Sequence, residues 1–307
     1  MRLRVLDVDG SLLLQPQLMG AVAAGEGDLV AAADLSPHLR FLADREGLGA
    51  LAGRLGAPRA GDIHFYGSGD FHHLAFLLVS RLDQPVNVVH FDNHPDWTRW
   101  PRTLGCGSWV SRLLERLEVA RVVTIGPCST DIDAPQMKAA DLPALRCGRL
   151  ELFPLAAGTT FYAGPAFETA AATGRAGIAP DGLSWRGIGA GDWVGEIDAI
   201  AARLPELPVW ISLDKDVLAP AEAVTNWDQG RLSLDAVLKA ISTIAERRRV
   251  IGMDVCGDFA PEGHDGALRG ILSFLDRAQR PEPGGDAAAI NGAANARILA
   301  HMEPILQ

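Results

Sequence analysis

The sequence predicts a three-layer α/β/α sandwich with a mostly parallel sheet, formed as a single domain over residues 1–307. Short apolar runs that end near Asp, Gly or Pro recur along the chain, and such runs are typical of buried parallel strands. Segments with apolar residues at helical spacing lie between them, which indicates βαβ units with right-handed crossovers. The chain has 307 residues, 48% of them apolar, so it can bury one large core.

Six segments are expected to be strands because each is a short and nearly continuous apolar run: residues 3–8, 62–66, 86–91, 121–125, 208–213 and 249–255. Helical spacing predicts helices at residues 71–81, 108–117 and 234–247, and Ser233 or Asp235 can cap the third. Residues 158–195 are rich in Gly and Ala and are expected to hold a strand and a long surface excursion. Residues 280–294 predict a loop followed by a final helix.

Composition excludes several classes of protein. The formal net charge is -10 and no basic stripe is present, so nucleic-acid binding is not expected. No run of 18 apolar residues occurs, so no membrane-spanning helix is expected. None of the four cysteines forms a C-x-x-C pair, which favours a reducing compartment, and we expect a cytoplasmic protein that could form an oligomer.

Ionisable residues follow the predicted strands at regular spacing. Asp92, His94 and Asp96 come after the strand at residues 86–91, and an extended chain would point all three to one side. Asp214 and Asp216 follow the strand at residues 208–213 in the same way. Ligand sites in α/β sheets gather at the carboxyl ends of strands, so we expect these groups to lie close together.

A Gly-rich turn, G-S-G-D-F-H-H at residues 67–73, adds His72 near the start of a predicted helix. Converging carboxylates would repel one another, and a divalent cation removes this conflict. Carboxylate oxygens and neutral imidazole suit manganese, zinc or iron. Two His and four Asp are about the number of ligands that a pair of ions with bridging carboxylates requires.

These segments resemble signatures of the arginase (ureohydrolase) superfamily. D-N-H-P-D at residues 92–96 is similar to D-A-H-x-D, and S-L-D-K-D-V-L-A-P at residues 212–220 is similar to S-x-D-x-D-x-x-D-P. G-S-G-D-F-H-H resembles G-G-D-H-S with an insertion before the His, which leaves His73 as the alternative to His72.

The resemblance implies a metal-dependent hydrolase with two ions, expected to be Mn²⁺, although zinc or iron could serve. His72 and Asp96 would complete one ion, and His94 and Asp216 the other. Asp92 and Asp214 would bridge the two ions. Water activated between the ions would attack a trigonal carbon and break a C–N bond, most simply that of a guanidino group, giving an amine and urea.

Three departures from the family pattern suggest a divergent branch that includes hydrolases of arginine side chains within peptides. The final D-P of the second signature is Ala219-Pro220 here. No His occurs where arginases carry a proton shuttle, and Cys106 is the nearest match. The late Glu that contacts the guanidinium aligns loosely with Asp254, with Asp258 as a competitor. The substrate could therefore be a small guanidino compound or an arginine-containing peptide.

Other interpretations remain open at the level of sequence. D-V-D-G-S at residues 7–11 resembles the nucleophile loop of haloacid-dehalogenase-type phosphatases, in which Asp7 would be the nucleophile. A deacetylase-like relative would hold a single zinc ion and hydrolyse amides. A third alternative is a non-catalytic binding protein that keeps the arginase fold.

Overall fold

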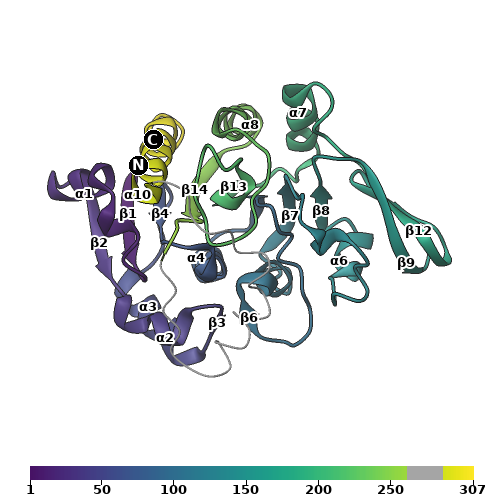
Figure 1. Cartoon of the computed structure of the whole chain (residues 1–307), viewed down its shortest axis with the longest axis horizontal. Helices are drawn as coiled ribbons and strands as arrows, with labels where there is room; N and C mark the ends of the chain where they lie inside the picture. Colours follow the sequence, from purple (N-terminus) through teal and green to yellow (C-terminus); the bar gives the residue numbers. More distant parts are fainter. Residues whose placement is uncertain (261–285) are drawn as a thin grey trace.

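The computed structural model describes residues 1–260 and 286–307, and its central feature is an eight-stranded parallel sheet. The strand order is β2-β1-β4-β14-β13-β5-β7-β8, and the sheet runs from β2 and β1 at the left of the molecule to β7 and β8 toward the right (Figure 1). The strands are β1 (Arg2–Asp7), β2 (Gly27–Ala31), β4 (Asp62–Phe65), β5 (Val86–Phe91), β7 (Val119–Ile125), β8 (Leu150–Phe153), β13 (Val209–Asp214) and β14 (Val250–Cys256).

Helices cover both faces of this sheet, each over its own apolar cluster. One cluster includes Leu18, Ile197, Ile241 and Ile298, from α1 (Pro16–Ala23), α7 (Trp193–Arg203), α8 (Leu234–Arg247) and α10 (Ala287–Met302). The other cluster packs against α2 (Ser36–Leu39), α3 (Arg45–Leu55), α4 (Leu74–Val79), α5 (Trp109–Leu113) and α6 (Leu142–Arg146). The expected three-layer α/β/α architecture is thus confirmed.

All six expected strands are present, but two strands of the sheet were not predicted. β2 lies at the edge of the sheet and has mostly exposed side chains, so it shows no continuous apolar run. β8 is the other edge strand, and its apolar run is interrupted by Glu151, which forms ion pairs with Arg121 and Arg203. Sequence patterns identify the buried centre of a parallel sheet better than its edges.

The predicted helix at residues 234–247 matches α8, and the Ser233 side chain accepts a hydrogen bond from the Ala236 N–H. The other two predicted helices begin as short 3₁₀ segments, η3 (Gly69–Phe71) before α4 and η4 (Cys106–Ser108) before α5. The expected final helix is α10. The loop expected before it lies outside the described residues, apart from Asp286, whose side chain caps α10.

The Gly- and Ala-rich segment forms more strands than expected. It contains a separate antiparallel sheet of β9 (Gly158–Gly164), β10 (Phe167–Glu168), β11 (Ala172–Gly174) and β12 (Gly177–Trp185), which projects from the right-hand side of Figure 1. The short strands β3 (Leu42–Ala43) and β6 (Leu104–Gly105) pair with each other near the carboxyl ends of the central strands. The Gly- and Ala-rich segment, residues 158–195, therefore forms a surface sheet as well as the start of α7.

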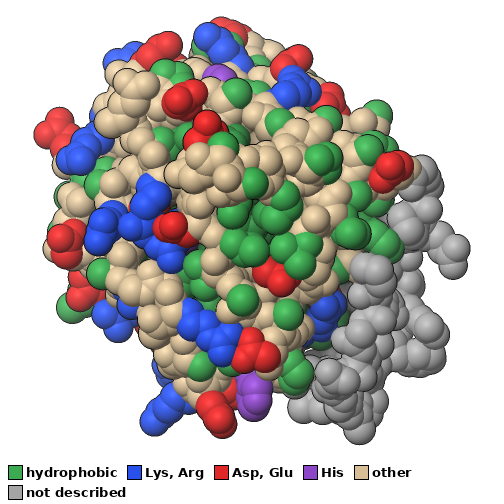
Figure 2. Space-filling view, turned by 90° about the vertical axis from the view of Figure 1, so that its left-hand side faces the viewer, with side chains coloured by type: hydrophobic (Ala, Val, Ile, Leu, Met, Phe, Trp, Pro, Cys, Tyr) green, Lys and Arg blue, Asp and Glu red, His purple; other side chains and the backbone are tan. Residues whose placement is uncertain are grey.

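The surface carries charges of both signs. Figure 2 shows the face on the side of α1 and β2, where basic and acidic side chains are interspersed around a group of hydrophobic ones. Among the described residues, no helix is long and apolar enough to cross a membrane.

Candidate metal centre

The candidate site lies where the connections of the parallel sheet diverge. β5 leads to β7 on one side, whereas the neighbouring β13 leads to β14 on the other side. Such a switch point opens a crevice at the carboxyl ends of the two strands. Asp92 directly follows β5 and Asp214 ends β13, so the fold brings these two carboxylates to the crevice.

The side chains of the segment after β5 come together because the backbone bends there, and not because it remains extended. Asp92 Oδ1 accepts a hydrogen bond of 2.6 Å from the His94 N–H, and Asp96 has a positive φ of 49°. The expectation of an extended i, i+2, i+4 arrangement was therefore wrong in its geometry, although all three side chains do reach the same site. Positive φ is uncommon for a residue with a side chain and often marks a functional position.

The segment after β13 forms a matching turn. Asp214 Oδ1 accepts a hydrogen bond of 2.9 Å from the Asp216 N–H at the start of the 3₁₀ segment η6 (Lys215–Val217). Asp216 Oδ2 lies 2.8 Å from His94 Nδ1, and Asp216 Oδ1 accepts a bond of 3.0 Å from the Asn93 N–H. The turns after β5 and β13 are thus joined directly.

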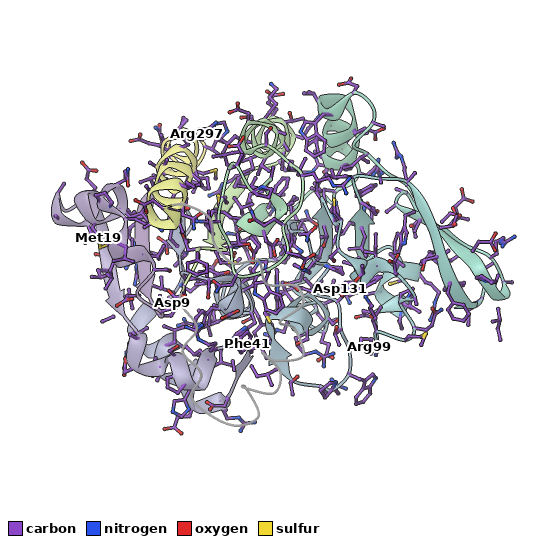
Figure 3. The ribbon with its side chains drawn as sticks, in the orientation of Figure 1. Asp9, Met19, Phe41, Arg99, Asp131 and Arg297 are labelled. Carbon is purple, nitrogen blue, oxygen red and sulfur yellow. The ribbon has the colours of Figure 1, made fainter. Side chains whose placement is uncertain are left out.

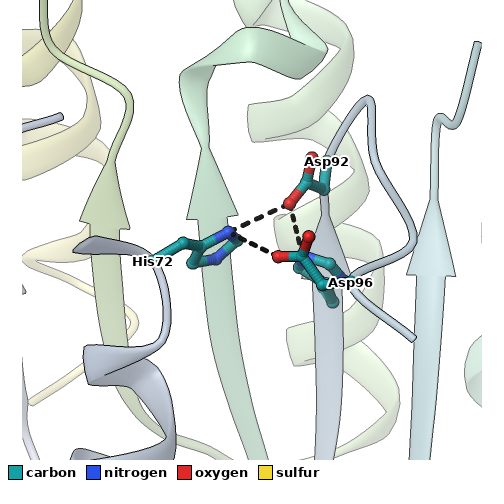
Figure 4. Close-up of side chains that lie close together, drawn as sticks. His72, Asp92 and Asp96 are labelled. Atoms are coloured by element: carbon teal, nitrogen blue, oxygen red, sulfur yellow. Dashed lines mark hydrogen bonds and ion pairs between the residues drawn. The ribbon is translucent and has the colours of Figure 1, made fainter. Parts of the chain in front are cut away.

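His72 enters from the end of η3 and completes the cluster (Figure 4). Its Nδ1 lies 3.0 Å from Asp92 Oδ2, 3.2 Å from Asp96 Oδ2 and 3.6 Å from Asp214 Oδ2. His73 is fully buried outside the groups that could hold an ion. The structure thus places His72 in the cluster and His73 outside it.

In the part of the chain that the structure describes, three overlapping groups of side chains have ligand atoms within 4.8 Å of one another and could hold a metal ion. They contain all six residues expected from the sequence, together with His90 and Cys256. His90 Nε2 lies 2.8 Å from Asp92 Oδ2, and the Cys256 thiol donates to Asp214 Oδ2 at 3.2 Å. The two-residue spacing between His90 and Asp92 could have identified His90, whereas Cys256 comes from the distant strand β14.

The cluster is buried and rich in negative charge, which shifts the pKa values of its members. Burial raises the pKa of Asp96 to about 6 and that of Asp216 well above its ordinary value, and charges of neighbouring carboxylates add to both shifts. Burial opposes protonation of His72 and His94, but the carboxylates beside them outweigh it and raise both pKa values. Protons and divalent cations are therefore competing ways to balance this buried charge.

Each of the two central imidazoles has a partner for its second ring nitrogen. His94 Nε2 lies 2.8 Å from Asp228 Oδ1, and the Asn93 side chain also donates to Asp228. His72 Nε2 lies 3.0 Å from Ser212 Oγ, which donates to Asp254 Oδ1 at 2.8 Å. Donation through Nε2 leaves the Nδ1 lone pair of each ring facing the cluster, which is the arrangement a metal-binding His requires.

Asp254 lies in an environment that differs from the one its expected contact with substrate requires. Its fully buried carboxylate accepts hydrogen bonds from Tyr66, Trp210 and Ser212, and it does not line the cavity at the cluster. Asp258 is also buried, paired at 2.7 Å with Lys215 Nζ. Neither placement favours contact with a substrate; Asp254 instead lies behind His72.

A cavity of about 240 Å³ opens over the cluster. Its lining includes the six expected cluster residues, Cys106, Asp131 and Trp227. Asp131 (labelled in Figure 3) lies in the segment after β7 and pairs with Lys138 at 3.3 Å. Among the described residues the lining contains no Lys or Arg, so the cavity favours a cationic ligand.

The phosphatase-like segment lies apart from this cavity. Asp7 accepts a hydrogen bond from the Gly10 N–H at 3.0 Å, and Asp9 (labelled in Figure 3) accepts from the N–H groups of Ser11 and Ser68 at 3.1 and 2.9 Å. Gly67 has a φ of +79°, and a Cβ there would lie 2.5 Å from Asp9 Oδ1. These contacts give Asp9 a structural role in positioning the turn that leads to His72.

The fold is similar to that of several solved structures. The agmatine ureohydrolase of Thermoplasma volcanium aligns over 98% of this chain and 87% of its own, with a TM-score of 0.55 and 13% identity. Arginase from Medicago truncatula aligns over 98% and 85%, with a TM-score of 0.54 and 13% identity. Proclavaminate amidino hydrolase from Streptomyces clavuligerus aligns over 98% and 90%, with a TM-score of 0.53 and 17% identity. The chain therefore has the arginase-like α/β fold.

Comparison of sequences gives less information about relatives of this chain than comparison of structures does. No family model matches the chain. An uncharacterized protein of Thermotoga maritima is 26% identical over 199 residues, which are 65% of this chain and 59% of that protein. The chain thus spans less than two thirds of the length of this relative.

Proposed function

We propose that this protein is a binuclear-metal hydrolase that cleaves the C–N bond of a guanidino group, releasing an amine and urea. The observation that carries the proposal is the convergence of two His and four Asp side chains beneath one cavity at the switch point of an arginase-like sheet. Perturbed ionisable groups in a concave site are typical of catalytic centres. We further propose that residues 1–307 act as one catalytic domain.

The donor set fits a pair of divalent ions. One ion would be held by His72 and Asp96, and the other by His94 and Asp216. Both ions would share Asp92 and Asp214. Oxygen and imidazole donors suit Mn²⁺, which we propose as the resident metal, with zinc or iron as the alternatives to be tested. When bound, two such ions would lower the pKa of a water molecule and polarise the substrate carbon.

The protein's own residues would position a cationic substrate. Of the described residues, Asp131 is the carboxylate that lines the cavity outside the six proposed ligands, so we propose it for the substrate-orienting role that the sequence suggested for Asp254. A carboxylate can receive two parallel N–H bonds from a guanidinium. The Trp227 ring belongs to the same lining and would offer an aromatic surface to the cation.

Cys106 also lines the cavity, which keeps it as the candidate for proton transfer in place of a shuttle His. If its thiol moves a proton to the leaving amine, Cys106→Ala should lower kcat by about 10²-fold or more while KM changes little. Cys106→Ser, which keeps an exchangeable proton, should be less affected. Unchanged kcat in Cys106→Ala would assign Cys106 to packing.

Urea release tests the proposal directly. The protein, reconstituted with Mn²⁺, would be offered guanidino compounds and arginine-containing peptides, with Asp92→Ala as the matched inactive control. Metal-dependent urea release that is lost in Asp92→Ala is the expected result. Hydrolysis of acetylated amines with one zinc ion per chain would instead support the amide-hydrolase alternative. Metal binding without turnover of any guanidino compound or amide would support a non-catalytic binding protein.

A further inference from the structure

A second cavity lies beside the metal cavity at the same edge of the sheet. It has a volume of about 750 Å³, a size typical of small-molecule sites, and lies beyond the carboxyl ends of β7 and β8. The two cavities lie next to each other along the chain, because Asp131 lines the first and Ile132 lines the second.

Asn93 joins segments that border the two cavities. The Asn93 side chain accepts a hydrogen bond of 3.1 Å from the Cys128 N–H and donates one of 2.9 Å to the Asp228 carbonyl. Asp228 is bonded to His94 in the proposed metal site, whereas Cys128 lines the second cavity. Asn93 thus links a residue that lines the second cavity to the residue that is bonded to His94.

The second cavity differs from the first in chemistry. Its walls are mainly apolar, with Ile132, Leu155 and Trp193 among them, and Trp193 Nε1 donates to the Ala236 carbonyl at 2.9 Å, joining α7 to α8. Arg231 is the charged residue of its lining. It is exposed at this cavity, and among residues 1–260 and 286–307 no carboxylate pairs with its guanidinium. An apolar cavity with one unpaired guanidinium is complementary to a carboxylate on an apolar chain.

We propose that the second cavity binds the apolar, carboxylate-bearing part of the substrate, with Arg231 as the group that receives the carboxylate. This inference rests on the proposed function for the other end of the ligand, because the cationic group would lie in the metal cavity. The two cavities together would select a guanidino compound that carries a carboxylate on an aliphatic or aromatic chain over one that ends in an amine.

Cys128 offers a test that does not require metal or turnover. This exposed thiol lines the second cavity, whereas Cys147, also exposed, follows α6 outside both cavities. Alkylation of each thiol would be followed by mass spectrometry with and without hexanoate, hexanamide or hexylamine as probes. We expect hexanoate to slow alkylation of Cys128 and not of Cys147, with hexanamide weaker and hexylamine inactive.

Variants of Arg231 distinguish recognition of the carboxylate charge from mere occupancy of the cavity by an apolar chain. Arg231→Ala should abolish protection by hexanoate, Arg231→Lys should retain part of it, and Arg146→Ala, beside Cys147, should leave it unchanged. Each variant is compared with itself without probe, because loss of a nearby charge alters thiol reactivity. Equal protection by all three probes, no protection in the wild type, or protection retained in Arg231→Ala would each overturn the proposal.

Kinetics extend the test to the whole site. The ratio of kcat/KM for 4-guanidinobutanoate over butylguanidine should fall about tenfold or more in Arg231→Ala, the loss expected for a charge-assisted hydrogen bond. An unchanged ratio would overturn the role of Arg231. If Cys128 is protected but no guanidino compound is hydrolysed, the proposed function fails while the carboxylate site stands.

Discussion

The orientation of His94 depends on a residue outside the proposed ligand set. Asp228 accepts from its Nε2 at 2.8 Å and is held by the Asn93 side chain, so the ring presents Nδ1 to the cluster. Outer partners of this kind fix the tautomer and strengthen the metal ligand. Ser212, which is in turn hydrogen-bonded to the buried Asp254, orients the His72 ring in the same way.

Asp228→Asn should therefore weaken metal binding by about 10- to 100-fold, because a neutral amide supports the required tautomer less well. The dissociation constant would be measured by competition with a fluorescent chelator. Asp131→Asn is the matched control, since Asp131 lines the cavity but has no described hydrogen bond to either cluster His. Equal affinities in wild type and Asp228→Asn would remove Asp228 from the site.

Proton competition should make metal affinity depend on pH. Asp96, with a pKa of about 6, and His72 and His94, with raised pKa values, hold protons in the metal-free protein that a cation must displace. Affinity should consequently rise as pH increases through 6 and continue to rise above the ordinary His range. Calorimetry in buffers of different ionisation enthalpy would count the released protons; pH-independent affinity without proton release would contradict this account.

Several site residues could be predicted from sequence and others could not. Asp92, His94 and Asp96, and likewise Asp214 and Asp216, have a short-range spacing after apolar runs. Asp228 and Cys256 have no such local pattern, because they reach the cluster only through the loop after β13 and the pairing of β14 with β13. The surroundings of Asp254 could not be predicted for the same reason, because its hydrogen-bond partners come from two separate segments: Tyr66 follows β4, and Trp210 and Ser212 lie in β13.

At the scale of elements, the ends of the central strands hold the site in shape by close backbone approach. Gly257, just after β14, has a φ of +86°, and a Cβ there would lie 2.3 Å from Asp214 Oδ1 and 2.6 Å from Lys215 N. Gly69 similarly approaches Asp214 Oδ2 from η3, where a Cβ would lie at 2.7 Å. The turns around Asp214 therefore leave no room for a side chain.

Gly257→Ala should lower the free energy of unfolding by about 1–3 kcal/mol and also reduce metal occupancy, because the added methyl group displaces the Asp214 carboxylate. Gly148→Ala is the control: its φ is +71°, but a Cβ would meet nothing within 4 Å. Urea unfolding and metal analysis would be run on both variants. A loss of stability in Gly257→Ala without any loss of metal would show that the turn does not position Asp214.

The C-terminal helix supports the same strand end from behind. Lys215 Nζ is fully buried and donates to Asp258 at 2.7 Å and to Asn295 of α10 at 2.9 Å. Asn295 also donates to the Gln15 side chain at 2.8 Å. These bonds join the start of the chain, α10 and the turn after β13, which sequence periodicity could not reveal because the partners lie far apart in the chain.

At the scale of the whole molecule, the alternation of apolar runs and helical patterns predicted the layers and six of the eight strands in the main sheet. It did not predict the strand order, because β14 and β13 insert between β4 and β5, which are consecutive predicted strands. That insertion creates the switch point between β13 and β5. The function of the cluster thus depends on long-range pairing that no single segment specifies.

We propose that one buried cluster holds two metal ions through shared carboxylates. Metal content of the purified, manganese-reconstituted protein should be measured by mass spectrometry for the wild type, Asp92→Ala, Asp214→Ala and a control, His38→Ala, at a partly exposed His outside the cluster. We expect about two ions per chain in the wild type and in His38→Ala, and almost none in the two Asp variants, because each removes a ligand common to both ions. A single ion in the wild type, or full occupancy in either Asp variant, would contradict the account.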